Sequence, residues 1–275
     1  MALLLGLGAG LSFGAADFVG GLAAKRSPAT TVTVLSQVAG FIVLLAVLPF
    51  LGGTVSAAAL GFGALAGIAG SLGLVAYLRA LAAGPMGLVA PITSITAVAV
   101  PVVAGLVAGE RLSILATGGL VLGLVAIGIV AGGGGRTREA GSAGPLLAVV
   151  GGLLVGAFLV LLDHTPDTSG LWPLVGARLA SLTMLGLWAF ATRAELPSRV
   201  NLRLIVGSGI LDMSANVLFL LATRAGALTV TSLLVSMSPV VIVLLARQVL
   251  AERLHRSQVT AVALSLVAVA AVTIG

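Results

Sequence analysis

The chain has 275 residues, of which 59% are apolar and only 8% are charged, and its formal net charge is +6. Soluble domains average about 45–50% apolar and about 25% charged residues, so this composition excludes a water-soluble protein. The basic residues lie mainly between apolar segments, where orientation of the chain in a membrane explains them better than nucleic-acid binding. We expect a multi-pass protein of the inner cell membrane that contacts the lipid bilayer and no nucleic acid.

Apolar segments long enough to cross a bilayer follow one another along the whole chain. About 20 apolar residues span the hydrocarbon core as a helix. Glycine, proline and short polar loops separate the segments, which favours helices over the strands of a barrel. We predict an all-α membrane protein whose ten transmembrane helices lie at residues 2–22, 30–51, 57–80, 88–108, 113–132, 144–162, 171–191, 202–223, 228–249 and 257–275.

The second half of the sequence repeats the first with an offset of 142 residues. Residues 77–112 and 219–254 are identical at eleven of 36 aligned positions, whereas membrane composition alone gives about one match in ten. The aligned pairs include Gly84 with Gly226, and both segments end in Glu-Arg-Leu. We infer that the chain consists of two copies of one unit.

Each copy contains five predicted spans. Because five is an odd number, the second copy is inverted in the membrane relative to the first. We place the repeats at residues 1–135 and 144–275, joined by a linker at 136–143. Inverted repeats are typical of secondary transporters, whose substrate site lies near the midplane between the halves.

Three recurring motifs resemble those of EamA-type repeats of the drug/metabolite transporter superfamily. They are the first-helix stretch "SFGAADFVGG" (12–21), "AAG" or "RAG" between the third and fourth spans, and "GERL" or "AERL" closing the fourth. Ser12 and Phe13 are candidate site residues in the first motif, where such proteins usually carry Trp at the position of Phe13. The resemblance implies a basket of helices one to four and six to nine around a central cavity, with helices five and ten outside.

Ionisable residues inside the spans are the strongest indication of a site, because charges in hydrocarbon are costly and usually functional. Asp17 is the only ionisable side chain between Ala2 and Ala24. With the side that holds the N-terminus named side A, residue counting at 1.5 Å per residue places Asp17 nearer side B. Gln37, Tyr77 and Arg79 fall at similar depth. We therefore predict one polar cluster made of these four residues.

The second repeat carries a second group of polar residues, nearer side A by the same counting. Arg178 and Asn216 fall at equal depth, and Asp212 precedes Asn216 by one helical turn on the same face. We predict that Arg178 and Asp212 form a buried ion pair, since an unpaired charge at that depth is strongly destabilising. Either cluster can fix helix packing alone or line a cavity that binds polar groups of a substrate or protons.

The sequence provides no catalytic centre, cofactor site or metal site that we recognise. It has no cysteine, no HExxH and no Gly-rich phosphate loop with lysine. Two intramembrane aspartates leave open an aspartyl protease-like enzyme, but their contexts "GAAD" and "GILD" lack the Gly-x-Gly-Asp motif of such proteases. A structural membrane subunit is the other alternative, although it does not account for buried charges in both halves.

We therefore predict a secondary transporter, not an enzyme, that exports or exchanges small molecules by alternating access, with protons as a candidate coupling ion. The resemblance implies amino acids or organic cations as substrates, and a monomer is the working expectation. No nucleotide-binding motif is present, so ion or substrate gradients supply the energy. The residues singled out for substrate binding or proton coupling are Asp17, Asp212, Asn216, Arg178, Gln37, Tyr77, Phe13 and Ser12.

The orientation in the membrane has two conflicting indications. The side-A loops carry two basic residues, Arg111 and Arg224, and the side-B loops carry nine: Lys25, Arg26, Arg136, Arg138, Arg193, Arg199, Arg203, Arg253 and Arg256. The positive-inside rule then places side B in the cytoplasm and both termini outside. The family resemblance implies cytoplasmic termini instead. Our hypothesis follows the charge count.

Overall fold

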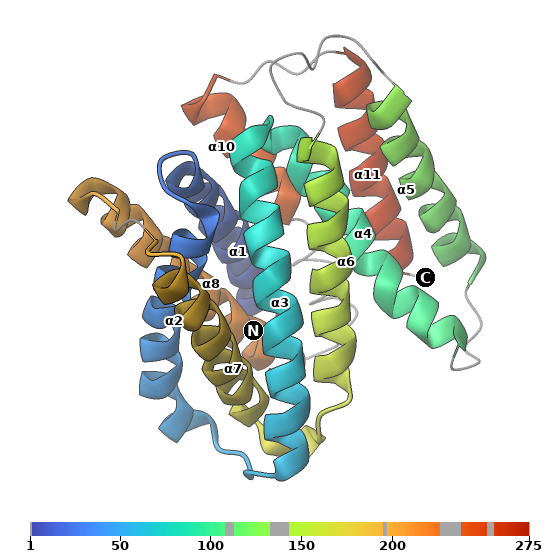
Figure 1. Cartoon of the computed structure of the whole chain (residues 1–275). Helices are drawn as coiled ribbons and strands as arrows, with labels where there is room; N and C mark the ends of the chain where they lie inside the picture. The colour runs from blue at the N-terminus through green and yellow to red at the C-terminus, as the bar shows by residue number, and fades with distance from the viewer. Residues whose placement is uncertain are drawn as a thin grey trace.

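The computed structural model describes residues 2–107, 113–132, 143–194, 197–225, 238–251 and 256–274, and every regular element in these ranges is a helix. Figure 1 shows the helices packed side by side as a bundle. In chain order they are α1 (Ala2–Ala24), α2 (Ala29–Leu51), α3 (Ala57–Ala83), α4 (Met86–Val107), α5 (Ile114–Gly132), α6 (Ala143–Asp163), the short 3-10 helix η1 (Asp167–Ser169), α7 (Trp172–Ala191), α8 (Arg199–Ala225), α10 (Ser238–Val249) and α11 (Arg256–Ile274).

Nine of the predicted spans have a helix whose first and last residues lie within three residues of the predicted ones. For the predicted span 228–249, residues 228–237 lie outside the described part of the chain, as does the predicted linker except Ala143, which begins α6. Six helices, α1, α2, α3, α6, α7 and α8, are long and apolar enough to cross a membrane. The protein is therefore a multi-pass, all-helical membrane protein over its described residues.

Large apolar side chains cover the outside of the bundle. Examples are Phe50, Ile114 and Phe190, which are 83%, 94% and 86% exposed. Water-soluble proteins rarely expose continuous apolar surface on this scale. Lipid chains contact such side chains without cost, so the exposed surface fits the membrane location that the composition predicts.

Helix α1 packs along α8 in the opposite direction. Gly8 lies against Leu218 near one end of the pair, and Gly20 lies against Ser208 near the other. Short turns connect α1, α2 and α3, and short loops connect α6, α7 and α8, so direction alternates within each group. Since α8 runs in the direction of α6, helix α6 is antiparallel to α1. The first three helices of the second repeat are thus inverted relative to those of the first.

Equivalent glycines bring the two repeats into backbone contact. Gly67 in α3 and Gly209 in α8 are separated by the repeat offset of 142 residues. A Cβ atom on Gly67 would lie 2.1 Å from the carbonyl oxygen of Ala177 in α7, and one on Gly209 would lie 2.0 Å from that of Ser36 in α2. Both positions therefore require glycine, because small residues let transmembrane backbones approach closely. Through these contacts, α2 packs closely against α8 and α3 packs closely against α7.

Helices α5 and α11 form a separate pair at one edge of the molecule, seen at the right of Figure 1. Both also contact α4, which lies between the pair and the rest of the bundle. They correspond to the fifth and tenth predicted spans, which the family resemblance places outside the basket. The bundle of α1, α2, α3, α6, α7 and α8 holds the polar residues discussed next.

Candidate functional site

Arg178 in α7 and Asp212 in α8 form an ion pair inside the bundle. The Nη2 atom of Arg178 donates to Oδ2 of Asp212 over 2.7 Å, and the two side chains are 14% and 33% exposed. This confirms the ion pair predicted from the sequence. Because each charge neutralises the other, the pair adds no net charge to the interior, and it links two neighbouring helices of the second repeat.

Asp17 in α1 has a different kind of partner. The hydroxyl of Tyr77 in α3 donates to Oδ2 of Asp17 over 3.4 Å, which is long for this type of bond. Tyr77 is buried and Asp17 is half-buried. Among the residues that the structure describes, no cation pairs with Asp17. Arg79, which we predicted to lie in this cluster, is exposed, and that part of the prediction is wrong.

Gln37 in α2 belongs with the second group of residues and not with Asp17 as predicted. Its side-chain oxygen accepts a hydrogen bond from the hydroxyl of Ser181, and both residues are buried. Ser181 lies three residues after Arg178 on α7 and also donates to the backbone carbonyl of Arg178 over 3.2 Å. Ser181 was missed in the sequence, although its spacing from Arg178 places both on one helix face.

The two predicted clusters meet in one polar centre. Asp17 in α1 and Asp212 in α8 lie on two helices that pack along each other, and both are within one turn of the contact between Ala16 and Ser208. Beside them, the hydroxyl of Ser208 in α8 donates to the backbone carbonyl of Ala16 in α1 over 2.8 Å. The prediction of two clusters at opposite depths is therefore wrong. Residue counting gives the position along a helix but not the tilt or rotation of that helix, so it separated side chains that the structure brings together.

Gly40 lets α2 approach the backbone of α8 beside the Arg178 guanidinium. A Cβ atom on Gly40 would lie 3.7 Å from Nη2 of Arg178 and 3.0 Å from the carbonyl oxygen of Gly209. Gly40 follows Gln37 by three residues, so one face of α2 contacts Ser181, the guanidinium and α8. We name the residues that meet between α1, α2, α3, α7 and α8 the polar centre: Asp17, Gln37, Tyr77, Arg178, Ser181 and Asp212.

Three further predicted site residues lie at the margin of the polar centre. The side-chain nitrogen of Asn216 donates to the backbone carbonyl of Asp212 over 2.8 Å, so the two residues share a face of α8 as predicted. Ser12 and Phe13 are half-buried on α1, about one turn before Asp17. Neither has a side-chain hydrogen bond to another described residue. They are placed near Asp17 by the helix and not by a contact of their own.

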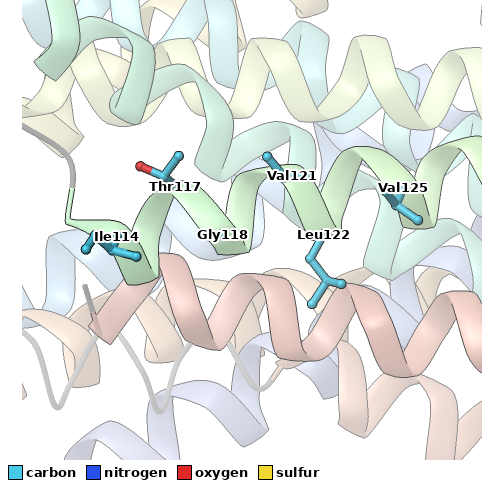
Figure 2. Close-up of a pocket in the computed structure, with 6 residues that line it drawn as sticks. All are labelled: Ile114, Thr117, Gly118, Val121, Leu122 and Val125. Atoms are coloured by element: carbon cyan, nitrogen blue, oxygen red, sulfur yellow. The ribbon is translucent and has the colours of Figure 1, made fainter.

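An apolar depression of about 490 Å³ on α5 is separate from the polar centre. It is lined by Ile114, Thr117, Gly118, Val121, Leu122 and Val125. Figure 2 shows these side chains along one helix, with Leu122 directed toward the neighbouring α11. The hydroxyl of Thr117 donates to the backbone carbonyl of Ser113 in its own helix. Apart from this hydroxyl, the side chains that line the depression are apolar.

Within the described residues, no group of three or more His, Asp or Glu side chains is arranged to hold a metal ion. The polar centre combines one neutralised ion pair, one carboxylate with a phenol partner and one amide–hydroxyl pair. This arrangement can hold a cation or a proton at Asp17.

Comparison with known proteins identifies the family. Residues 1–132 and 142–274 each match the EamA-like transporter family, and no curated protein matches the chain. Twenty-two chains of solved structures match. One crystal structure, with 19% identity and a TM-score of 0.63, covers 99% of this chain and 96% of its own. At that identity the likeness shows the fold alone. Because the two family matches cover nearly the whole sequence, this chain belongs to the EamA-like transporter family, a family of membrane transporters within the drug/metabolite transporter superfamily.

Proposed function

We propose that the protein is a ten-span secondary transporter of the inner cell membrane that exports or exchanges small cationic metabolites by alternating access. Organic cations, and amino acids recognised through their amino group, are the substrate class. Asp17 binds the positive group of the substrate or a proton, one at a time. Such competition couples the outward movement of substrate to the inward movement of protons without nucleotide hydrolysis.

The observation that carries this proposal is the unequal pairing of the two carboxylates. Asp212 is neutralised by Arg178, whereas Asp17 has only the phenol of Tyr77. When Asp17 is ionised, the described charged groups of the polar centre are two negative and one positive, which leaves one negative charge. An isolated charge in a low-dielectric interior attracts a counter-ion strongly. A cationic group or a proton is the species that this site favours.

The remaining residues have supporting roles in this proposal. The Arg178–Asp212 pair and the Gln37–Ser181 hydrogen bond hold α2, α7 and α8 together beside Asp17. Asn216, one turn beyond Asp212, offers a half-buried amide. Ser12 and Phe13 line the approach to Asp17 along α1. An Arg178 already engaged by Asp212 argues against a zwitterion site in which a free arginine binds the substrate carboxylate.

The proximity of Asp17 and Asp212 is the one observation that favours an aspartyl protease-like enzyme. Two carboxylates act as such a catalytic dyad when they share one proton between them. Asp212 instead accepts a 2.7 Å hydrogen bond from the Arg178 guanidinium, which holds it in its charged form. The pairing therefore favours transport over proteolysis.

The test is transport by the purified protein in proteoliposomes. The substrate is first chosen by a thermal-shift screen of amines, amino acids, nucleosides and sugars. An imposed pH gradient should then drive accumulation by the wild-type protein. Asp17→Asn keeps the shape of the side chain and removes its charge, and it should abolish gradient-driven accumulation. Tyr77→Phe, which removes only the phenol hydroxyl, should retain coupling and alter the apparent affinity.

Two outcomes would contradict the proposal. Accumulation by the Asp17→Asn variant in response to the gradient would show that Asp17 is not the coupling site. Stabilisation only by neutral or anionic compounds in the screen would show that the site does not select cations.

A further inference from the structure

Two sets of hydrogen bonds join the repeats, one at each end of the molecule. On side B, the amide nitrogen of Asn201, near the start of α8, donates to the carbonyl oxygen of Ala23 over 3.1 Å and to the hydroxyl of Ser27 over 2.6 Å. On side A, the backbone N–H of Thr54 donates to the carbonyl oxygen of Thr168 over 2.9 Å. The Thr54 hydroxyl donates to the same oxygen over 3.3 Å.

The two contacts use equivalent parts of the two repeats. The side-B contact joins the α1–α2 turn to the start of α8, and the side-A contact joins the α6–α7 loop to the loop before α3. Ser56 and Ser198, which are separated by the repeat offset, each accept a hydrogen bond from the backbone N–H three residues later, at Ala59 and Asn201. Inversion of the repeats therefore places the two contacts in equivalent segments, although different residues of those segments form them.

The side-A contact depends on close backbone approach. Gly170 has a φ of +55°, a conformation that L side chains rarely adopt. A Cβ atom there would lie 2.5 Å from the carbonyl oxygen of Gly52. The loops on side A therefore meet closely through main-chain atoms, whereas both hydrogen bonds of the side-B contact come from the side chain of Asn201.

The side-B contact is buried and incompletely satisfied. Asn201 is 1% exposed, and its Oδ1 accepts no hydrogen bond from the described residues. The amide cannot be turned over to correct this, because its Oδ1 would then face the carbonyl oxygen of Ala23, and two acceptors repel each other. A buried acceptor without a donor is costly, and access of water removes the cost. The closed side-B contact is therefore biased toward opening.

Exposed basic residues on the two segments that meet at this contact also favour its opening. Lys25 and Arg26 lie on the α1–α2 turn, and Arg199 and Arg203 lie one turn apart on the first part of α8. Like charges repel, most strongly at low ionic strength. The hydrogen bonds of Asn201 hold together two segments that their charges push apart, as a two-state element requires.

We propose that Asn201 is the latch that closes side B of the transporter, and that the Thr54–Thr168 contact is its counterpart on side A. Release of Asn201 from Ala23 and Ser27 opens the polar centre toward side B while side A stays closed. This inference rests on the alternating access proposed above. It adds the residue that controls access from one side.

Distances between spin labels test the latch without any transport assay. The chain has no cysteine, so labels attach only where cysteines are introduced. One pair, at Pro28 and Val200, reports side B, and a second pair, at Val55 and His164, reports side A. Asn201→Ala and Ser27→Ala should each add a longer-distance population on side B and leave the side-A distances unchanged. The double variant should add little to either single one.

Ser208→Ala is the matched control. Like Asn201, Ser208 donates from α8 to a backbone carbonyl of α1, but two turns deeper. Its loss should leave the side-B distances unchanged. Unchanged side-B distances in Asn201→Ala, or equal broadening in Ser208→Ala, would overturn the latch. Because these distances need no substrate, such a result is distinguishable from a failure of the cation coupling assigned to Asp17.

Discussion

Asp17 and Asp212 are two carboxylates of one polar centre that differ in their partners. Asp212 is held by the Arg178 guanidinium at 2.7 Å, whereas Asp17 accepts a 3.4 Å hydrogen bond from the Tyr77 hydroxyl. The difference separates a charge that stabilises the fold from a charge that is available for a ligand. The two roles are distinguished by the partner of each carboxylate, and not by its burial or by its position in the sequence.

The repeats share their packing and not their charges. Gly67 and Gly209 occupy equivalent positions and make equivalent backbone contacts. In contrast, the repeat offset aligns Asp17 with Leu159 and Asp212 with Gly70. The equivalent glycines give both repeats the same close helix packing, and this packing does not depend on the polar residues, which differ between the repeats.

The largest expected effect on stability is the loss of one partner of the ion pair. Arg178→Leu or Asp212→Leu should each lower the free energy of unfolding by about 3 kcal/mol, at the low end for buried pairs, because the remaining charge is partly buried without a partner. The double variant should lose clearly less than the sum of the two. Unfolding in detergent micelles measures all three. Additive losses would mean that the two side chains are not energetically coupled.

The shared packing should be the next most sensitive feature. Gly67→Ala and Gly209→Ala each place a Cβ atom about 2 Å from a backbone carbonyl oxygen of the neighbouring helix. Such overpacking should cost about 1–3 kcal/mol at both positions. Gly207→Ala is the matched control, since nothing lies within 4 Å of its Cβ position. Thermal unfolding of the three variants checks this, and a loss at only one of the two equivalent glycines would break the symmetry argument.

Asp17→Asn should change stability in the opposite direction from loss of the ion pair. Asn stays neutral at every pH and so removes the cost of ionising a half-buried carboxyl that has no cationic partner; it should raise the free energy of unfolding by about 1 kcal/mol when Asp17 would be ionised. The same detergent unfolding experiment measures this difference. A loss comparable to that of Asp212→Leu would indicate that Asp17 has a charged partner and belongs with the structural residues.

Ser181→Ala should have a small effect that sharpens the assignment of Gln37. It removes the hydroxyl that donates to Gln37 and should lower the free energy of unfolding by about 1 kcal/mol. Thr183→Ala, on the same helix but exposed and bonded only to a backbone carbonyl of its own helix, should cost less. A double-mutant cycle of Ser181→Ala with Gln37→Leu should show coupling. No coupling would separate Gln37 from the second group of residues.

The orientation of the protein in the membrane, and thus the side from which the two carboxylates are reached, can be tested with variants that should leave stability unchanged. If side B is cytoplasmic, a cysteine at Ser142 in the linker resists a membrane-impermeant thiol reagent in intact cells. A cysteine at Thr168, in the α6–α7 loop on side A, reacts readily. The reverse pattern would favour the cytoplasmic termini that the family resemblance implies.

The sequence by itself determined the class of protein, the helices, the repeat and the family. Hydropathy and loop composition are local properties, so the helix bounds of nine spans fell within three residues of the predictions. The recurring Glu-Arg-Leu and glycine positions revealed the repeat because they need no knowledge of packing. Arg178 and Asp212 were also paired correctly, since buried opposite charges at similar depth have few alternatives.

Only the tertiary structure decided which residues make up the site. Helix tilt and rotation determine which side chains meet, and neither can be read from residue counting within a span. That is why Gln37 was assigned to Asp17 instead of Ser181, and why Arg79, which is exposed, was placed in the cluster with Asp17. Gly40 and Asn201 gain their importance solely from neighbours on other helices. Hydrophobicity determines where the membrane spans lie in the sequence, whereas the rotation of each helix determines which polar side chains meet between the spans.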